Sequence, residues 1–186
     1  MYQNHSVHSL TLQKMNTSLP SYRYGPAFFS GEVTTPLDYN FETHIDDFIK
    51  KSGKNLSANG QLCDANFANA SNKLVPGKRY HTKIVPIIEY INHCQRCVDD
   101  LLTVRGIKLF GAQGLVLFKQ QHPHRIPKGN VLSFDRRKNL YLPGIDREVV
   151  PYMRFASDGT TEFSYIHFWS SLSSQGEYVL VFFEDD

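Results

Sequence analysis

Three short stretches of the sequence carry residues that could act together on one substrate. "LTVRGIKLFG" contains Arg105, "NVLSFDRRKN" contains Ser133, and "SSQGEYVLV" contains Gln175 and Glu177. An arginine offers a fork of donors that matches a diphosphate, and a serine hydroxyl at the end of a strand can orient a sugar. A carboxylate stabilises the positive charge that develops as a glycosidic bond breaks. The three stretches therefore suit cleavage of the glycosidic bond of a nucleotide.

Glu177 stands at the start of the most apolar segment, "EYVLVFF". Apolar residues on both faces of a strand are typical of a central, doubly covered strand, and strand-borne side chains are held more accurately than loop-borne ones. Gln175 lies two residues earlier and therefore on the same face as Glu177. The simpler interpretation, a turn residue before an edge strand, remains open.

The order Arg-Gly, strand-Ser, Gln-x-Glu resembles that of the mono-ADP-ribosyltransferases, especially the C3-like bacterial exoenzymes. In that family a helical N-terminal part leads into a strand with the NAD-binding arginine, then a Ser-Thr-Ser strand, then a turn into Gln-x-Glu or Glu-x-Glu. The resemblance implies NAD as cofactor, a protein side chain as acceptor, and an ADP-ribosyltransferase-like fold. It implies catalytic roles for Glu177 and Gln175, and NAD contacts for Arg105, Ser133, Phe134, Arg136 and Arg137.

Two helices are predicted in the N-terminal part. "NFETHIDDFIKKSG" places apolar residues at helical spacing and ends at a glycine; they are Phe41, Ile45, Phe48 and Ile49. "TKIVPIIEYINHCQRCVDDLL" repeats apolar residues at the same spacing over residues 82–102.

Short predicted strands follow Leu102, and turn signals separate them. They are "LTVRGIKLF", "GLVLFKQ", "NVLSFD", "NLYLPG", "VPYMRFA", "FSYIHFW" and "EYVLVFF". Helices followed by strands predict an α+β fold, with N-terminal helices packed on a mixed or antiparallel core. Residues 1–20 are predicted to form a polar tail and residues 21–186 a single domain.

The composition excludes few classes of partner. The 186 residues are 41% hydrophobic and carry a formal net charge of +2, which does not argue for nucleic acid. No apolar run is long enough to span a bilayer, and we expect a monomer. The first residues lack the pattern of a cleavable signal peptide. They resemble the Ser/Asn-rich leaders of injected effectors, so we expect secretion by that route or a cytoplasmic protein.

Three cysteines favour a reducing compartment over a disulfide scaffold. Cys94 and Cys97 could form a zinc site with His93 and Cys63, but their place within a predicted helix favours half-buried thiols without metal. His122 and His124, or a Cys63–His pair, are weaker candidates for chemistry.

Two alternatives to a working transferase remain. The chain could be a non-catalytic α+β interaction or inhibitor protein that uses the aromatic stretch "FSYIHFWSS". It could also be an inactive transferase-fold effector, because the triplet reads Ser133-Phe134-Asp135 and lacks the threonine and the second serine.

Overall fold

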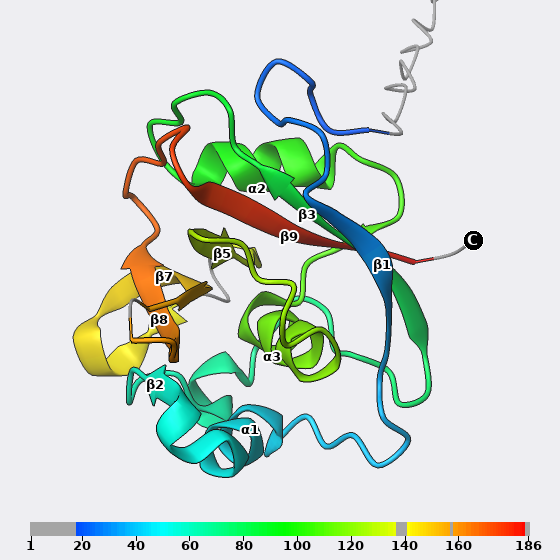
Figure 1. The fold of residues 1–186 in the computed structure, drawn as a ribbon, viewed down its shortest axis with the longest axis vertical. Coiled ribbons are helices and arrows are strands. Elements are labelled where there is room, and N and C mark those ends of the chain that lie inside the picture. The colour runs from blue at the N-terminus through cyan, green and yellow to red at the C-terminus, as the bar shows by residue number, and fades with distance from the viewer. Residues whose placement is uncertain (1–17, 137–140, 157, 185–186) are drawn as a thin grey trace, which may run out of the picture.

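The computed structural model describes residues 18–136, 141–156 and 158–184, and Arg137 lies outside this part. The fold is α+β, with a mixed sheet covered by helices on both faces (Figure 1). The sheet has nine strands, with order β1-β3-β9-β5-β7-β8-β2; β4 also pairs with β9, and β6 with β7. The strands are β1 Phe29–Thr34, β2 Leu56–Ala58, β3 Arg79–Pro86, β4 Ile107–Lys108, β5 Asn130–Leu132, β6 Tyr141–Leu142, β7 Arg147–Phe155, β8 Thr161–His167 and β9 Glu177–Phe183.

Strand β9 lies at the centre of the sheet, as its apolar sequence predicts. It pairs antiparallel with β3 and parallel with β5. Leu180 and Phe182 belong to the core on one face of the sheet, and Val179 and Val181 to the core on the other. All four side chains are buried, so β9 needs a covering layer on each face.

Helices α1 His44–Ser52 and α3 Gly111–Gln121 cover one face, and α2 Gln95–Leu102 covers the other (Figure 1). Helix α3 is buried along most of its length. Gly114 brings it close to β9, because an added Cβ would lie only 2.7 Å from the Phe182 ring.

The prediction for α1 is confirmed, but other segments were assigned wrongly. Residues 82–102 do not form one helix: their first part belongs to β3, and α2 begins only at Gln95. In β3, Thr82 and Ile84 are buried while His81 and Lys83 are exposed, which is the alternation of a strand. "GLVLFKQ", predicted as a strand, forms most of α3. The helices are therefore interspersed among the strands and not gathered in the N-terminal part.

A buried polar network joins α1 to α3. The carboxylate of Asp64 accepts hydrogen bonds from the backbone N–H groups of Ile45 (3.1 Å) and Asp46 (2.9 Å) in the first turn of α1. It also accepts one from Nε2 of Gln113 (2.7 Å), whose Oε1 accepts from the hydroxyl of Tyr39 at 2.9 Å. Asp64 therefore acts as a remote N-terminal cap for α1.

We predict that Asp64→Ala lowers the free energy of unfolding by about 3 kcal/mol, because it leaves a buried amide and two helix N–H groups without an acceptor. Urea denaturation measures this. The exposed Asp38 provides the control: Asp38→Ala should change stability by less than about 0.5 kcal/mol. Equal effects of the two substitutions would contradict the capping role.

His44 is a buried histidine packed against Tyr39, with ring centroids 4.8 Å apart. Its Nε2 has no hydrogen-bond partner within the described part of the chain. Burial lowers the pKa of His44 to about 4. The folded state therefore holds this ring neutral at pH values where the unfolded chain protonates it.

This difference makes stability depend on pH. As pH falls from 6.5 toward 4, the imidazole of His44 binds a proton in the unfolded state but stays neutral in the folded state. The free energy of unfolding should therefore fall by up to about 3 kcal/mol over this range. Urea denaturation of the wild type and His44→Leu between pH 7 and pH 4 measures this loss. The variant should lack this component; an identical pH dependence in both proteins would show that His44 does not cause it.

Candidate functional site

Glu177 is the first residue of β9, and its half-buried carboxylate lies where the strand begins. Its Oε2 accepts a hydrogen bond from the backbone N–H of Ser173 at 2.6 Å, and its carbonyl oxygen accepts from Ile87 N–H at 2.9 Å. Burial raises the pKa of Glu177. The strand thus anchors this carboxylate, as the sequence predicts.

Gln175 is exposed and lies in the turn before β9. It lines a hollow of about 610 Å³ together with Lys128, Asn130 and Arg154. Gly129 is required at the edge of this hollow, because a Cβ there would lie 2.1 Å from the carbonyl oxygen of Gly176. The hollow therefore forms where two backbone turns meet.

Ser133 and Phe134 are core residues, each 1% exposed. The next residue, Asp135, is also buried, and its carboxylate accepts a hydrogen bond from Ser71 N–H at 2.9 Å. Arg136 is exposed after this segment. The predicted NAD contacts of Ser133 and Phe134 would therefore require the core to open.

Arg105 lies in an exposed turn between α2 and β4 and not on a strand. Strand β4 pairs with the last residues of β9, with Ile107 opposite Phe183. Glu177 begins β9, so the two predicted site residues lie at opposite ends of a strand about 20 Å long. The prediction that Arg105 and Ser133 lie on adjacent strands is wrong: β4 and β5 each pair with β9, at different places along it.

Cys94 and Cys97 are fully buried and not half-buried as predicted. Cys94 immediately precedes α2, and Cys97 lies in its first turn. Burial raises the pKa of both thiols, that of Cys97 to about 12. Their environment thus keeps them neutral, in the role of small apolar core residues. Among the described residues, no group of three or more His, Cys, Asp or Glu side chains could hold a metal ion.

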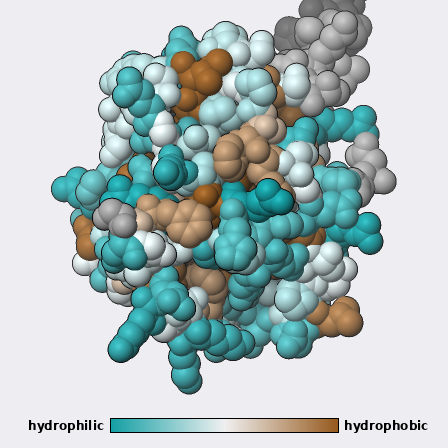
Figure 2. Space-filling model, in the orientation of Figure 1, coloured by the Kyte–Doolittle hydropathy of each residue, from teal (hydrophilic) through white to brown (hydrophobic). Residues whose placement is uncertain are grey.

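The aromatic stretch "FSYIHFWSS" divides between core and surface. Phe163 and Phe168 are fully buried, whereas Trp169 is 53% exposed. The face shown in Figure 2 is mostly hydrophilic, and its apolar residues form small separate groups. His167 and Trp169 of this stretch line a hollow together with Asp146, Arg147 and Glu148, whereas another hollow is lined mainly by apolar side chains.

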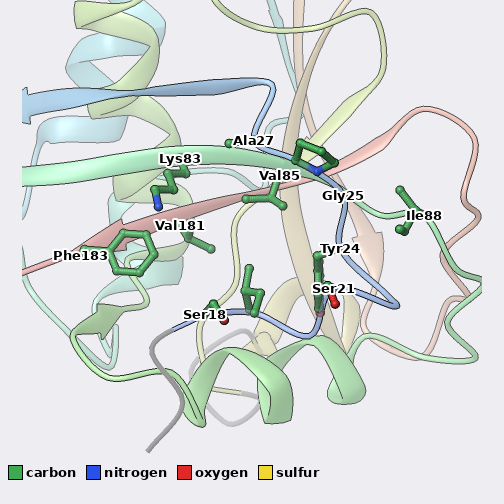
Figure 3. A pocket seen from close by; sticks show the side chains of 12 residues that line it. Ser18, Ser21, Tyr24, Gly25, Ala27, Lys83, Val85, Ile88, Val181 and Phe183 are labelled. Carbon is green, nitrogen blue, oxygen red and sulfur yellow. The ribbon is translucent and has the colours of Figure 1, made fainter.

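Such a hollow lies on the α2 face of the sheet (Figure 3) and has a volume of about 460 Å³. Its floor comes from β3 and β9, through Lys83 and Val85 and through Val181 and Phe183. The segment from Ser18 to Ala27 forms its wall, with Ile88 at the rim. We refer to this hollow as the β3–β9 groove.

The wall of the β3–β9 groove is tied to both neighbouring elements. The buried Arg23 forms an ion pair with Asp100 of α2, and the Tyr24 hydroxyl donates to the same carboxylate at 3.2 Å. Gly25 N–H donates to Pro86 O at 3.0 Å, and Ile88 N–H donates to Arg23 O at 2.9 Å. These bonds fix the wall to α2 on one side and to the end of β3 on the other.

Lys83 is the only charged side chain among the described residues that line the groove. Its ammonium lies 5.2 Å from the centroid of the Phe183 ring, a cation–π arrangement. Figure 3 shows Lys83 on the same side of the strands as Val181 and Phe183. The groove thus combines apolar side chains with one positive charge.

Sequence reasoning missed this groove for two reasons. Lys83 was assigned to a helix, and no local sequence pattern specifies the path of the segment around Tyr24. The alternation of buried and exposed residues in "RYHTKIVP" is the signal that places Lys83 on the open face of a strand.

Comparison with known proteins finds no matching family model, no matching curated protein and no matching solved structure. No helix in the described part of the chain is long and apolar enough to cross a membrane.

Proposed function

We propose that the protein binds a small amphipathic anion in the β3–β9 groove. The apolar body of the ligand lies against Val85, Ile88 and Val181, and its anionic head lies at Lys83. The single observation that carries this proposal is that, among the described residues of the lining, Lys83 is the one charged side chain. The activity is non-catalytic binding of a small molecule, which differs from the interaction or inhibitor protein that the sequence left open.

The size and the charge of the groove support this choice of ligand. A volume of about 460 Å³ falls within the roughly 300–1,000 Å³ of small-molecule sites. Each methylene group that leaves water contributes about 0.8 kcal/mol, so a chain of several carbons gives useful affinity. No ion pair of Lys83 occurs within the described part of the chain, so its ammonium is available to a carboxylate, sulfonate or phosphate head.

We predict that Lys83→Met weakens binding of decanoate about fivefold to tenfold, because it removes the one cation that faces the head group. Binding of decanol, which has the same chain and no charge, should stay within about twofold. Isothermal titration calorimetry measures both ligands. Lys54→Met removes an exposed charge outside the groove lining and should bind decanoate as the wild type does.

Ala27→Trp provides the complementary variant, because Ala27 lines the groove and is exposed. A bulky side chain there should weaken decanoate and decanol alike. If Lys83→Met binds decanoate as tightly as the wild type, or if Ala27→Trp affects neither ligand, the β3–β9 groove is not the binding site.

A second candidate is the NAD-dependent transferase, with its ADP-ribosyltransferase-like fold, that the sequence predicts. One observation favours it: Gln175 shares its hollow with Lys128 and Arg154. These cations offer donors for a diphosphate in place of Arg105, although Arg154 Nε also contacts a Glu162 carboxylate oxygen at 2.7 Å. In this proposal Glu177 stabilises the transition state, and a protein side chain enters at the Gln175 turn.

For the transferase, we predict that NAD raises the melting temperature and that Glu177→Ala lowers NAD hydrolysis about a hundredfold to a thousandfold. The melting temperature without NAD should change little, because Glu177 is half-buried and makes one hydrogen bond to an exposed turn. Glu42→Ala, at an exposed position, is the control. The absence of any NAD-dependent shift would reject this candidate and leave the groove proposal untouched.

A further inference from the structure

Another hollow lies on the face of the sheet opposite to the β3–β9 groove, where α1 and α3 end. Its volume is about 480 Å³, and its lining includes Lys51, Lys119 and His124. Lys51 is in the last turn of α1, and Lys119 is in the last turn of α3. Phe155, from the end of β7, forms an apolar wall. We refer to this hollow as the α1–α3 hollow.

Two lysines are the charged side chains in the described lining of the α1–α3 hollow. None of the described residues that line it is acidic, and no ion pair involves Lys51 or Lys119 within the described part of the chain. Ser52 and Asn55 add a hydroxyl and an amide to the same lining. The groups that face the hollow are therefore cations and neutral hydrogen-bonding groups, which suit an oxyanion.

Lys119 is held in place in this hollow. Its ammonium donates to the carbonyl oxygen of Pro123 at 2.9 Å and lies 4.5 Å from the centroid of the Phe155 ring. These contacts leave hydrogens of the ammonium for another acceptor. Burial lowers the pKa of Lys119, because the surrounding protein partly desolvates its charge. A bound anion would add a charge-assisted contact to the carbonyl and ring contacts that the ammonium already makes.

The ends of the helices explain part of this arrangement. A lysine in the last turn of a helix interacts favourably with the helix dipole, which accounts for each lysine separately. It does not account for the meeting of two lysines and a histidine around one hollow. That convergence, together with the missing carboxylate, is the observation that points to a ligand.

We propose that the α1–α3 hollow binds the phosphate group of a small molecule, independently of the β3–β9 groove. Lys51 and Lys119 supply the charge that a phosphate requires. Two sources of this group are distinguishable by experiment: free inorganic phosphate, and a phosphomonoester whose apolar part lies against Phe155.

The test is calorimetric titration of the full chain with inorganic phosphate and with phenyl phosphate, with sodium chloride holding the ionic strength constant. Lys51→Gln and Lys119→Met should each weaken binding about tenfold, as expected for loss of a charged hydrogen-bond donor. Lys50→Gln is the matched control, because Lys50 precedes Lys51 in α1, is exposed, and lies outside the lining. Its affinity should stay within about twofold of the wild type. Tighter binding of phenyl phosphate would identify the phosphomonoester as the source.

Melting temperatures separate the proposal from a general salt effect, because phosphate stabilises many proteins by exclusion from their surface. Low millimolar phosphate should raise the melting temperature of the wild type and of Lys50→Gln, but not that of Lys119→Met. Without phosphate, Lys119→Met should melt close to the wild type, because methionine keeps an unbranched apolar side chain beside Phe155 and removes a partly desolvated charge. If Lys119→Met fails to fold, Lys51→Gln carries the comparison. Equal phosphate affinity in Lys50→Gln and Lys51→Gln, or no binding by the wild type, would overturn the proposal.

Discussion

Burial of strand β9 on both of its faces is the constraint on which the rest of the structure depends. Residues 179–182 place four consecutive buried side chains at the centre of the sheet, and such a strand is stable only if each face of the sheet is covered. The two covers are unequal. Helices α1 and α3 pack together on one face, whereas in the described part of the chain α2, which is eight residues long, is the only helix on the other face. A helix of that length spans about 12 Å, while β9 spans about 20 Å. The segment that contains Arg23 and Tyr24 completes the cover, and the β3–β9 groove is the part of the face that it leaves open.

Both proposed sites follow from how these covers end. On the α2 face, Lys83 projects from a part of β3 that no helix of the described residues covers, beside the apolar side chains of β9. On the other face, α1 and α3 end at the same place, so the lysines of their last turns converge. In both sites the lysines belong to a strand or a helix. The apolar side chains beside them, Phe183 in the groove and Phe155 in the hollow, pack against the edge of a hydrophobic core. The two hollows lie on opposite faces of one sheet, so their ligands do not compete for space.

Much of the fold could be predicted from the sequence, and the errors have physical causes. The apolar residues on both faces of β9 correctly predicted an interior strand, and the spacing of apolar residues in α1 correctly predicted a helix. "GLVLFKQ" was assigned to a strand because a fully buried helix and a buried strand both appear as a continuous apolar run. Residues 82–102 were assigned to one helix because Ile84, Ile87 and Ile91 satisfy helical spacing, although Ile84 is held in β3 by pairing with β1 and β9.

The candidate site was harder to predict from the sequence than the fold. Short motifs give an order along the chain, but the antiparallel pairing of β4 with the end of β9 places Arg105 far from Glu177. The groove depends on an irregular segment whose path no local pattern specifies.

The central claim is that the β3–β9 groove recognises an amphipathic anion through Lys83. The most direct measurement is a nuclear magnetic resonance titration of the labelled chain with decanoate, which follows the backbone amide signals. The account predicts saturable shifts concentrated at Gly25, Lys83, Val85, Val181 and Phe183, with little change at Gln175 or Glu177. Shifts centred instead on the Gln175 turn, or the absence of any saturable shift, would contradict it.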